Sequence, residues 1–216
     1  MEKILAVDLC DTLYKSNTTQ DFLNYVFAKD ELYKKLKRKN SSFSFKVVNK
    51  LSNKILKKDK SRILMTKILK GKSLEEIDSL VDNFIIDYLE PLKIEKVHKI
   101  INDYKMQGYK VIIISASYDF IAKRIVKKLG FDGYITSEAE VLENKYTGEV
   151  SRDILYTKFN VFKNKYTVNE NLVMITDNTT DYGFVKQTKK SYIVINNRNK
   201  DFWNQHKEEK FIFVEE

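Results

Sequence analysis

The chain has 216 residues, 43% of them hydrophobic, a length that suits one α/β core with an inserted subdomain. Its single cysteine excludes an internal disulfide and a cysteine-rich zinc site, so we expect a reducing, cytoplasmic location. The net charge is +9, and no apolar run approaches the roughly 18 to 20 residues that a membrane-spanning helix needs. The start, Met1-Glu2-Lys3, lacks the basic region and long apolar stretch of a secretion signal.

The first predicted strand, residues 4–7, ends at the motif Asp8-Leu9-Cys10-Asp11-Thr12-Leu13. An apolar strand that stops at a carboxylate places the acid at the carboxyl edge of a sheet, where open α/β folds form their ligand crevices. Asp8 and Asp11 could instead cap a following turn. The sequence therefore predicts that a site begins at Asp8, with capping as the alternative.

Residues 18–89 are predicted to be helical, with hardly any strand. Hydrophobic side chains recur there at helical spacing, and Ser73-Leu74-Glu75-Glu76 is typical of an N-cap and first helical turn. Pro91, the only proline, marks a break. We therefore expect an inserted α-helical cap subdomain over residues 18–89 and a core formed by residues 1–17 and 90–216.

The rest of the chain alternates between helices and strands. In chain order we expect a helix at 94–106, a strand at 110–114, a helix at 119–129 ending at Gly130, short strands around 138–140 with a turn at Asn144-Lys145, a helix at 155–163, a strand at 172–176, a helix at 182–187, a strand at 192–195, and a final helix followed by a strand at 211–214. Such alternation predicts a mostly parallel sheet with helices on both faces.

Polar side chains end further strands of the predicted core. Ser115 follows one strand, Asp177 and Asp181 follow another, and Lys158 lies between them in the chain. Asp, Ser, Lys and an Asp pair in this order resemble the four motifs of the haloacid dehalogenase superfamily, whose members are mostly magnesium-dependent phosphatases. The resemblance implies an α/β fold with a Rossmann-like core and an inserted helical cap.

Other segments resemble one branch of that superfamily. They are Asn17-Thr18-Thr19-Gln20-Asp21-Phe22, Ser115-Ala116-Ser117, and Glu140-Val141 followed by Tyr146-Thr147-Gly148. These are similar to the subfamily that contains phosphoserine phosphatase and phosphatidylglycerophosphatase-type enzymes. The expected substrate is a small phosphorylated metabolite, or a lipid or sugar intermediate.

The resemblance implies that Asp8 is the nucleophile and forms an aspartyl-phosphate. Two close carboxylates, Asp8 and Asp177, would repel each other unless a cation lay between them, and Mg²⁺ prefers such oxygen ligands. By the resemblance, the main-chain carbonyl of Cys10 is a third ligand. Asp181 then holds a coordinated water or positions Lys158.

The phosphate of the substrate is expected to contact Ser115, Ala116 and Lys158, where Lys158 neutralises charge and Ser115 donates a hydrogen bond. Thr19 and Arg62 lie in the part of the chain that would supply further substrate contacts. Taken singly, each of these two is more simply a surface residue.

The first motif departs from the phosphatase pattern Asp-x-Asp-Gly-Thr, because Cys10 replaces the second Asp and Asp11 replaces the Gly. That second Asp protonates the leaving alcohol, and losing such a group typically costs about 10² to 10⁴ in rate. Substrates with acidic leaving groups would need little protonation, and Asp11 is an alternative acid. A thiolate nucleophile at Cys10 is disfavoured, because neither histidine lies in a strand-end motif.

Three functions follow from these residues. The first is a Mg²⁺-dependent phosphohydrolase, and the second is a catalytically weak relative that binds a phosphorylated ligand or a partner. The third is a 2-haloacid dehalogenase, which the Asp177 and Asp181 pair disfavours because that branch does not need the metal.

The positive charge is concentrated in residues 29–72, where sixteen Lys or Arg and three acids give a net charge of +13 and leave the rest of the chain at −4. This segment could be a solvated helix surface, a docking face for an anionic substrate or membrane surface, or a nucleic-acid surface. Nucleic acid is the weakest of the three, because no recognition motif accompanies the charge.

Overall fold

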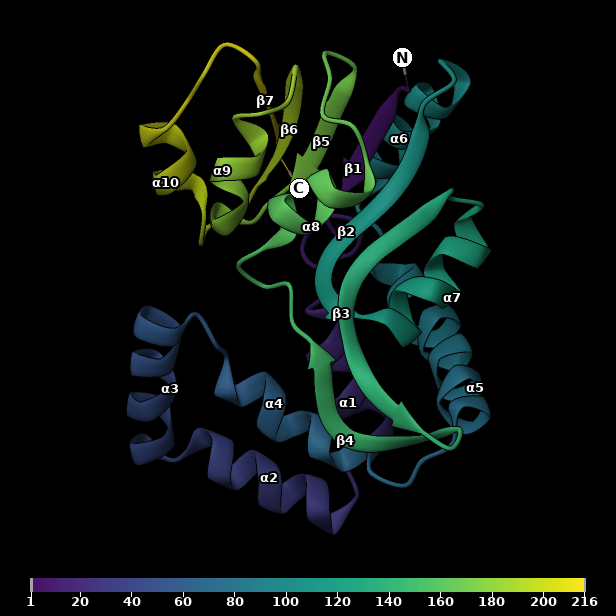
Figure 1. The fold of residues 1–216 in the computed structure, drawn as a ribbon, viewed down its shortest axis with the longest axis vertical. Helices are drawn as coiled ribbons and strands as arrows, with labels where there is room; N and C mark the ends of the chain where they lie inside the picture. The colour runs from purple at the N-terminus through teal and green to yellow at the C-terminus, as the bar shows by residue number, and fades with distance from the viewer. Residues whose placement is uncertain (1, 216) are drawn as a thin grey trace.

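The computed structural model describes residues 2–215, and within these a seven-stranded sheet forms the centre of the molecule (Figure 1). Its spatial order is β4-β3-β2-β1-β5-β6-β7. The strands are β1 (Ile4–Val7), β2 (Lys110–Tyr118), β3 (Gly133–Leu142), β4 (Lys145–Arg152), β5 (Leu172–Thr176), β6 (Lys190–Ile195) and β7 (Phe211–Glu215). Every neighbouring pair is parallel except β3 and β4, which confirms the predicted α/β fold with a mostly parallel sheet.

Five helices follow β1 directly, without an intervening strand. They are α1 (Thr18–Phe27), α2 (Glu31–Ser41), α3 (Phe43–Leu56), α4 (Lys60–Thr66) and α5 (Leu74–Phe84), with the short helical turns η1 (Lys67–Leu69), η2 (Ile85–Leu89) and η3 (Glu90–Leu92). The helical character predicted for this segment is confirmed. Figure 1 shows α2, α3 and α4 in the lower part of the view, below β6 and β7 and level with the far end of the β3–β4 hairpin.

The remaining helices alternate with the strands. They are α6 (Glu95–Met106), α7 (Asp119–Leu129), α8 (Lys158–Lys165), α9 (Tyr182–Val185) and α10 (Lys200–Gln205), with the turn η4 (Thr179–Asp181). Among the helices of residues 2–215, none combines the length and the apolar character that crossing a bilayer requires.

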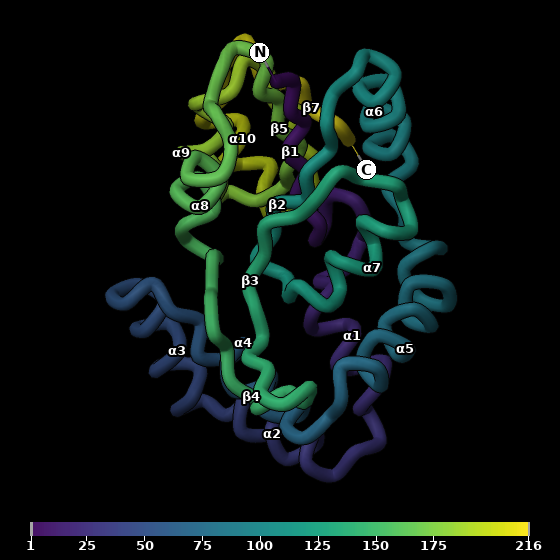
Figure 2. Tube along the Cα trace, turned by 45° about the vertical axis from the view of Figure 1, so that its right-hand side comes forward, coloured from purple at the N-terminus to yellow at the C-terminus, as the bar shows by residue number. Residues whose placement is uncertain are grey.

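Each face of the sheet buries its own apolar cluster, because side chains along a strand alternate between the faces. Leu5 and Val7 of β1 belong to the cluster beneath α6 and α7. Ile4 and Ala6 belong to the cluster that α8, α9 and α10 cover. Figure 2 shows these two groups of helices on opposite sides of the sheet. The sheet is therefore covered on both faces, as predicted.

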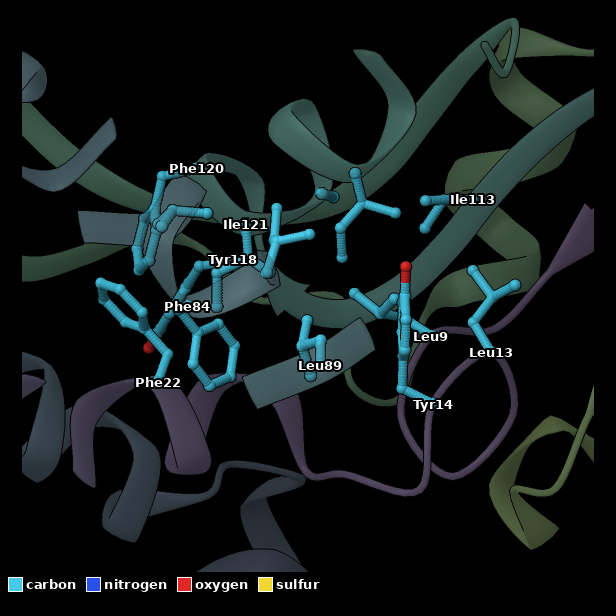
Figure 3. Packing of buried hydrophobic residues seen from close by; sticks show 14 of the residues in the cluster. Leu9, Leu13, Tyr14, Phe22, Phe84, Leu89, Ile113, Tyr118, Phe120 and Ile121 are labelled. Carbon is cyan, nitrogen blue, oxygen red and sulfur yellow. The ribbon is translucent and has the colours of Figure 1, made fainter. Parts of the chain in front are cut away.

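Aromatic side chains join the helices after β1 to the sheet. Phe22 of α1 packs against Phe84 of α5 and against Phe120 of α7, with ring centroids 5.5 Å apart in both pairs (Figure 3). All three side chains are buried in the cluster that also contains Val7. Aromatic pairs of this kind stabilise a core beyond the area that they bury. Consequently, α1 and α5 share one core with the sheet.

The hairpin of β3 and β4 is longer than the short strands predicted around residues 138–140. β3 runs unbroken from Gly133 to Leu142, and the positive φ angles of the turn fall at Glu143 and Asn144. The beginning of β4 is hydrogen-bonded to the segment after η1, since the Gly71 amide donates to the carbonyl oxygen of Tyr146 at 2.8 Å. This contact between distant parts of the chain extends the strands, and no local pattern encodes it.

Of the other boundaries that differ from the prediction, two bear on the site. β2 continues four residues beyond Ile114 to Tyr118, and the helix expected at 155–163 begins at Lys158. Asp153 accepts a hydrogen bond from the Leu155 amide at 3.0 Å, which holds a turn before the helix. The later start places Lys158 in the first turn of α8.

We expect Gly148→Ala to destabilise the protein more than Gly108→Ala. Their φ angles are +84° and +78°, and this region costs other residues about 1–2 kcal/mol. A Cβ at Gly148 would meet main-chain atoms of Lys67 at 3.3 Å, whereas one at Gly108 would meet nothing within 4 Å. Overpacking should add about 1–3 kcal/mol to the loss of unfolding free energy measured in urea. Equal losses would show that the hairpin does not depend on close packing against η1.

Candidate active site

The ends of neighbouring strands bring the polar motif residues together. β1 lies between β2 and β5, with its last residue in register with Ile113 and Ile175. Asp8 follows this position directly, and its amide donates to the carbonyl oxygen of Ile175 at 2.9 Å. Because the three strands are parallel and in register here, Ser115 of β2, two residues after Ile113, and Asp177, two residues after Ile175, lie beside Asp8.

The ammonium group of Lys158 lies between two buried carboxylates. Its Nζ donates to Oδ2 of Asp8 at 2.7 Å and to Oδ2 of Asp181 at 2.8 Å, and none of the three side chains is more than 3% exposed. Burial alone would lower the pKa of Lys158, but the charges of Asp181 and Asp8 outweigh it and raise the pKa. Thr176 also donates to Oδ2 of Asp181 at 2.8 Å. Lys158 is therefore a fixed positive charge beside Asp8.

Asp177 lies partly buried at the same edge. Its Oδ1 accepts a hydrogen bond from Thr12 Oγ1 at 3.2 Å, and its Oδ2 accepts one from Asn196 Nδ2 at 3.4 Å. Burial raises the pKa of Asp177 to about 8, and the negative charges of Asp8 and Asp11 contribute to the shift. A cation between Asp8 and Asp177 would relieve this repulsion.

The oxygen donors of the site suit a hard cation. Within residues 2–215, no three His, Cys, Asp or Glu side chains form a group that could hold a metal ion. Mg²⁺ is commonly bound by one or two carboxylates, with waters and substrate oxygens completing its shell. Asp8 and Asp177 fit that pattern, whereas Oδ2 of Asp181 is already engaged by Lys158 and Thr176.

The Cys10 side chain lies in a cluster of hydroxyl groups. Its Sγ is 3.1 Å from Ser117 Oγ and 3.3 Å from Thr18 Oγ1, and these two hydroxyls are 2.6 Å apart. Burial raises the pKa of the Cys10 thiol, and the charge of Asp8 raises it further. The thiol is therefore neutral, which argues against a thiolate nucleophile.

Asp11 is turned toward a different partner. Its backbone has a φ of +46°, and its Oδ2 accepts a hydrogen bond from Arg198 Nη2 at 2.6 Å. Left-handed backbone is the conformation for which glycine is the usual residue. Asp11 therefore adopts a backbone conformation for which glycine is the usual residue, and it forms an ion pair with Arg198.

A cavity of about 260 Å³ opens above Asp8, between the strand ends and the helices α1, α2 and α4. Seven of the predicted site residues line it: Asp8, Cys10, Thr19, Arg62, Ser115, Ala116 and Lys158. Asp11, Asp177 and Asp181 do not. The cavity is therefore lined by the predicted nucleophile and phosphate contacts, and the other three carboxylates are not part of its lining.

Arg62 spans from α4 to the strand ends. Its Nη1 pairs with Oδ1 of Asp153 at 2.8 Å, and its Nη2 donates to the carbonyl oxygen of Ala116 and to Ser137 Oγ. Thr19 Oγ1 accepts a hydrogen bond from the Tyr118 amide at 3.4 Å. Both predicted substrate contacts thus line the cavity while bonding to other parts of the protein.

Several cavity residues were not singled out from the sequence. Asn178 follows Asp177 directly, and Ser117 belongs to the quoted Ser115-Ala116-Ser117 segment, so both stood close to recognised motifs. Tyr33 and Lys37 come from α2. Nothing in the lysine-rich sequence of α2 distinguishes Lys37 from its neighbours, because only the packing of α2 against α4 directs it to the cavity.

The haloacid dehalogenase-like hydrolase family model matches residues 5–186. A protein of Mycobacterium tuberculosis (strain ATCC 25618 / H37Rv), which carries the name probable phosphatase, is 27% identical over 146 residues. The match covers 67% of this chain and 50% of that protein. This chain thus spans about half the length of the relative.

Solved structures with the same fold cover nearly the whole chain. A protein of unknown function from Bordetella pertussis Tohama I has a TM-score of 0.77 at 13% identity, covering 99% of this chain and 98% of that one. A phospho-aspartyl intermediate analogue of phosphoserine phosphatase has a TM-score of 0.62 at 19% identity, covering 93% and 90%. At such identities the likeness establishes the fold alone.

We expect the metal-free protein to lose stability between about pH 4 and pH 8 through Asp177. The unfolded carboxyl releases its proton near pH 3.9, whereas the folded one has a pKa of about 8. The folded state therefore binds more protons in this window, and stability falls as pH rises, by at most about 1.4 kcal/mol per pH unit. Solvent around the partly exposed carboxyl reduces this limit.

Urea unfolding in a chelator at several pH values measures the effect. Asp177→Asn should flatten the fall, while Glu149→Gln, an exposed acid on β4, should leave it unchanged. An Asp177→Asn profile parallel to the wild-type profile would contradict the prediction.

Proposed function

The chain belongs to the haloacid dehalogenase-like hydrolase family, and we propose that it is a phosphohydrolase that uses Asp8 as its nucleophile. The observation that supports this most is the buried Lys158 ammonium group, which contacts Asp8 at 2.7 Å and lines the same cavity. A positive charge at this place serves both the attacking carboxylate and the phosphate that it attacks.

The reaction proceeds in two displacements. A carboxylate oxygen of Asp8 attacks phosphorus while the bond from phosphorus to the leaving oxygen breaks, so the phosphoryl group passes to Asp8. A water then attacks phosphorus, the bond to Asp8 breaks, and the carboxylate and inorganic phosphate are formed. The aspartyl-phosphate that the first step forms is the species whose analogue was solved for phosphoserine phosphatase.

The surrounding residues orient the phosphate. Lys158 stabilises charge on the phosphoryl oxygens, and Asp181, with Thr176, holds Lys158 in place. Ser115 is 2% exposed and lines the cavity, and its hydroxyl can donate to a phosphoryl oxygen. Ala116 lines the cavity next to Ser115, where its main chain can contact the phosphate.

Mg²⁺ is the proposed cofactor, held by Asp8, Asp177 and the carbonyl oxygen of Cys10, with Asp181 behind Lys158. When bound, it would neutralise charge on the phosphate and remove the repulsion between the carboxylates. The raised pKa of Asp177, caused by burial and by Asp8, supports a cation at this place.

We infer that the leaving group is acidic, as in acyl, anomeric or aryl phosphates. Position 10 lines the cavity, where the usual acid would act, but it carries a neutral thiol. Asp11 is paired with Arg198 and lies outside the cavity, so its use as the acid requires that this ion pair opens. A leaving group that departs without a proton needs neither residue.

A second candidate is a catalytically weak protein that binds a phosphorylated ligand. The same thiol favours it, because a retained cavity with no acid at position 10 would still hold a phosphate. The dehalogenase alternative has less support, because Asp177 would serve no purpose in a metal-independent reaction.

The cavity suits a small phosphorylated metabolite or the headgroup of a lipid or sugar intermediate. Two of the sixteen basic residues of the segment 29–72 line it, Lys37 and Arg62. The other basic residues of this segment lie outside the cavity lining, on the protein surface. A reducing cytoplasm remains the proposed location, because the single cysteine can form no internal disulfide.

Turnover of an aryl phosphate in the presence of Mg²⁺ tests the proposal. We expect the wild-type protein to release phenolate and Asp8→Asn to show only background release. Asp177→Ala should abolish the rise in melting temperature that Mg²⁺ and a phosphate mimic produce. Stabilisation by the phosphate mimic without any turnover would instead establish the binding protein.

Restoring the acid tests the role of position 10. We expect Cys10→Asp to raise turnover of alkyl phosphates by up to roughly 10² to 10⁴, because an alkoxide needs a proton to depart, and to change aryl phosphates little. Cys10→Ser, which adds no acid, serves as the control. Wild-type rates that are alike for alkyl and aryl phosphates would show that another group transfers the proton.

A further inference from the structure

The outward surface of α3 is apolar. Phe43, Leu51 and Ile55 are 84%, 53% and 71% exposed. Together with the exposed Val47 they recur every four residues, so they form one stripe along the helix. Val48 adds to its width. A contiguous apolar strip of this kind on a protein surface marks a site of contact.

The inward side of α3 is mostly polar, with Phe45 as its one apolar residue, partly buried against the core cluster. Asn49 Nδ2 donates to Asp59 Oδ1 at 3.1 Å, and the Ser61 amide donates to Asn49 Oδ1 at 3.2 Å. Ser52, the one buried residue of α3, donates from Oγ to the carbonyl oxygen of Lys58 at 2.8 Å. Surface helices ordinarily turn their apolar face to the core. Here the hydrogen bonds hold the helix with its apolar stripe in solvent.

A row of lysines runs beside the stripe. Lys46, Lys50 and Lys54 also recur every four residues, and no acidic residue occurs from position 32 to position 58. An apolar stripe beside a basic one, on a single helix, is the pattern of a helix that lies in the headgroup region of an anionic membrane.

We propose that α3 docks on the surface of an anionic lipid bilayer, with its apolar stripe at the headgroup boundary and its lysines against the lipid anions. Charge complementarity selects this occupant. A second copy of the chain would bring two lysine rows face to face, and a nucleic acid would leave the apolar stripe in solvent.

The place of α3 in the fold gives the docking a consequence. Figure 1 shows α3 at the lower left edge of the molecule, below α10, β6 and β7. The helices before and after it both line the cavity, α2 through Tyr33 and Lys37 and α4 through Ser61 and Arg62. Docking through α3 therefore holds the cavity close to the lipid headgroups.

Co-sedimentation with vesicles tests the proposal without any substrate, so its outcome is independent of the proposed reaction. The vesicles contain phosphatidylcholine alone or with 30 mol% phosphatidylglycerol, an amount chosen to give roughly the surface potential of an anionic leaflet. The variants are Leu51→Gln/Ile55→Gln and Lys50→Gln/Lys54→Gln. The matched controls are Ile86→Gln/Met106→Gln, 59% and 80% exposed on other helical segments, and Lys99→Gln/Lys127→Gln.

The wild-type protein should bind the anionic vesicles, remain free with phosphatidylcholine alone, and bind more weakly as salt rises above ~0.1 M. The lysine pair should lower the partition coefficient roughly 30-fold, since each lysine near an anionic surface is worth about a factor of five. The apolar pair should lower it at least about tenfold. Both control pairs should bind like the wild type.

The proposal would be overturned if the wild-type protein did not bind the anionic vesicles, or if either α3 double variant bound as tightly as the wild type. A loss of binding in the control variants as large as that in the α3 variants would also overturn it. So would a change from dimer to monomer on Leu51→Gln/Ile55→Gln in analytical ultracentrifugation, because α3 would then be an interface between copies. All substituted side chains of the two α3 pairs are exposed, and circular dichroism verifies the fold. Should one pair unfold, the other decides the matter.

Discussion

The buried ion cluster of Lys158 with Asp8 and Asp181 is the interaction on which the site depends. Its members come from the end of β1, the first turn of α8 and the turn η4, so the cluster joins three separate elements at one edge of the sheet. Removing one partner from such a buried pair typically costs about 3–5 kcal/mol, because the remaining charge is left uncompensated. The cluster therefore fixes the position of the Asp8 carboxylate. It also places three charged groups at one edge of the sheet.

That arrangement leaves more negative than positive charge at the sheet edge. Lys158 compensates part of the charge of Asp8 and Asp181, and Asp177 stands beside them without a basic partner among its hydrogen bonds, which come from Thr12 and Asn196. Burial raises the pKa of Asp177, and the negative charges of Asp8 and Asp11 raise it further. An edge built in this way favours the binding of a cation, which is the electrostatic basis for proposing magnesium here.

The helices α1 to α5, which follow β1, differ in what they pack against. α1 and α5 bury aromatic rings against the sheet and so become part of its core, while α2 and α4 close the cavity. α3 is held in place by the hydrogen bonds of Asn49 and Ser52 and by the partly buried Phe45, and it keeps its apolar stripe in solvent. Exposed apolar area contributes nothing to folding, which is why a partner outside the fold is proposed for this stripe.

The sequence by itself determined the fold class and the motif residues, because strand ends, helical spacing and the order Asp8, Ser115, Lys158 and Asp177 are local properties of the chain. It could not determine that Asp11 pairs with Arg198 or that Cys10 lies against the hydroxyls of Thr18 and Ser117. Nor could it separate Lys37 from the other lysines, or place the apolar side of α3 outward rather than inward. Helical periodicity identifies two faces of a helix and leaves open which of them packs. Only the tertiary contacts decide that, because the hydrogen bonds of Asn49 and Ser52 depend on where the chain returns after the helix ends.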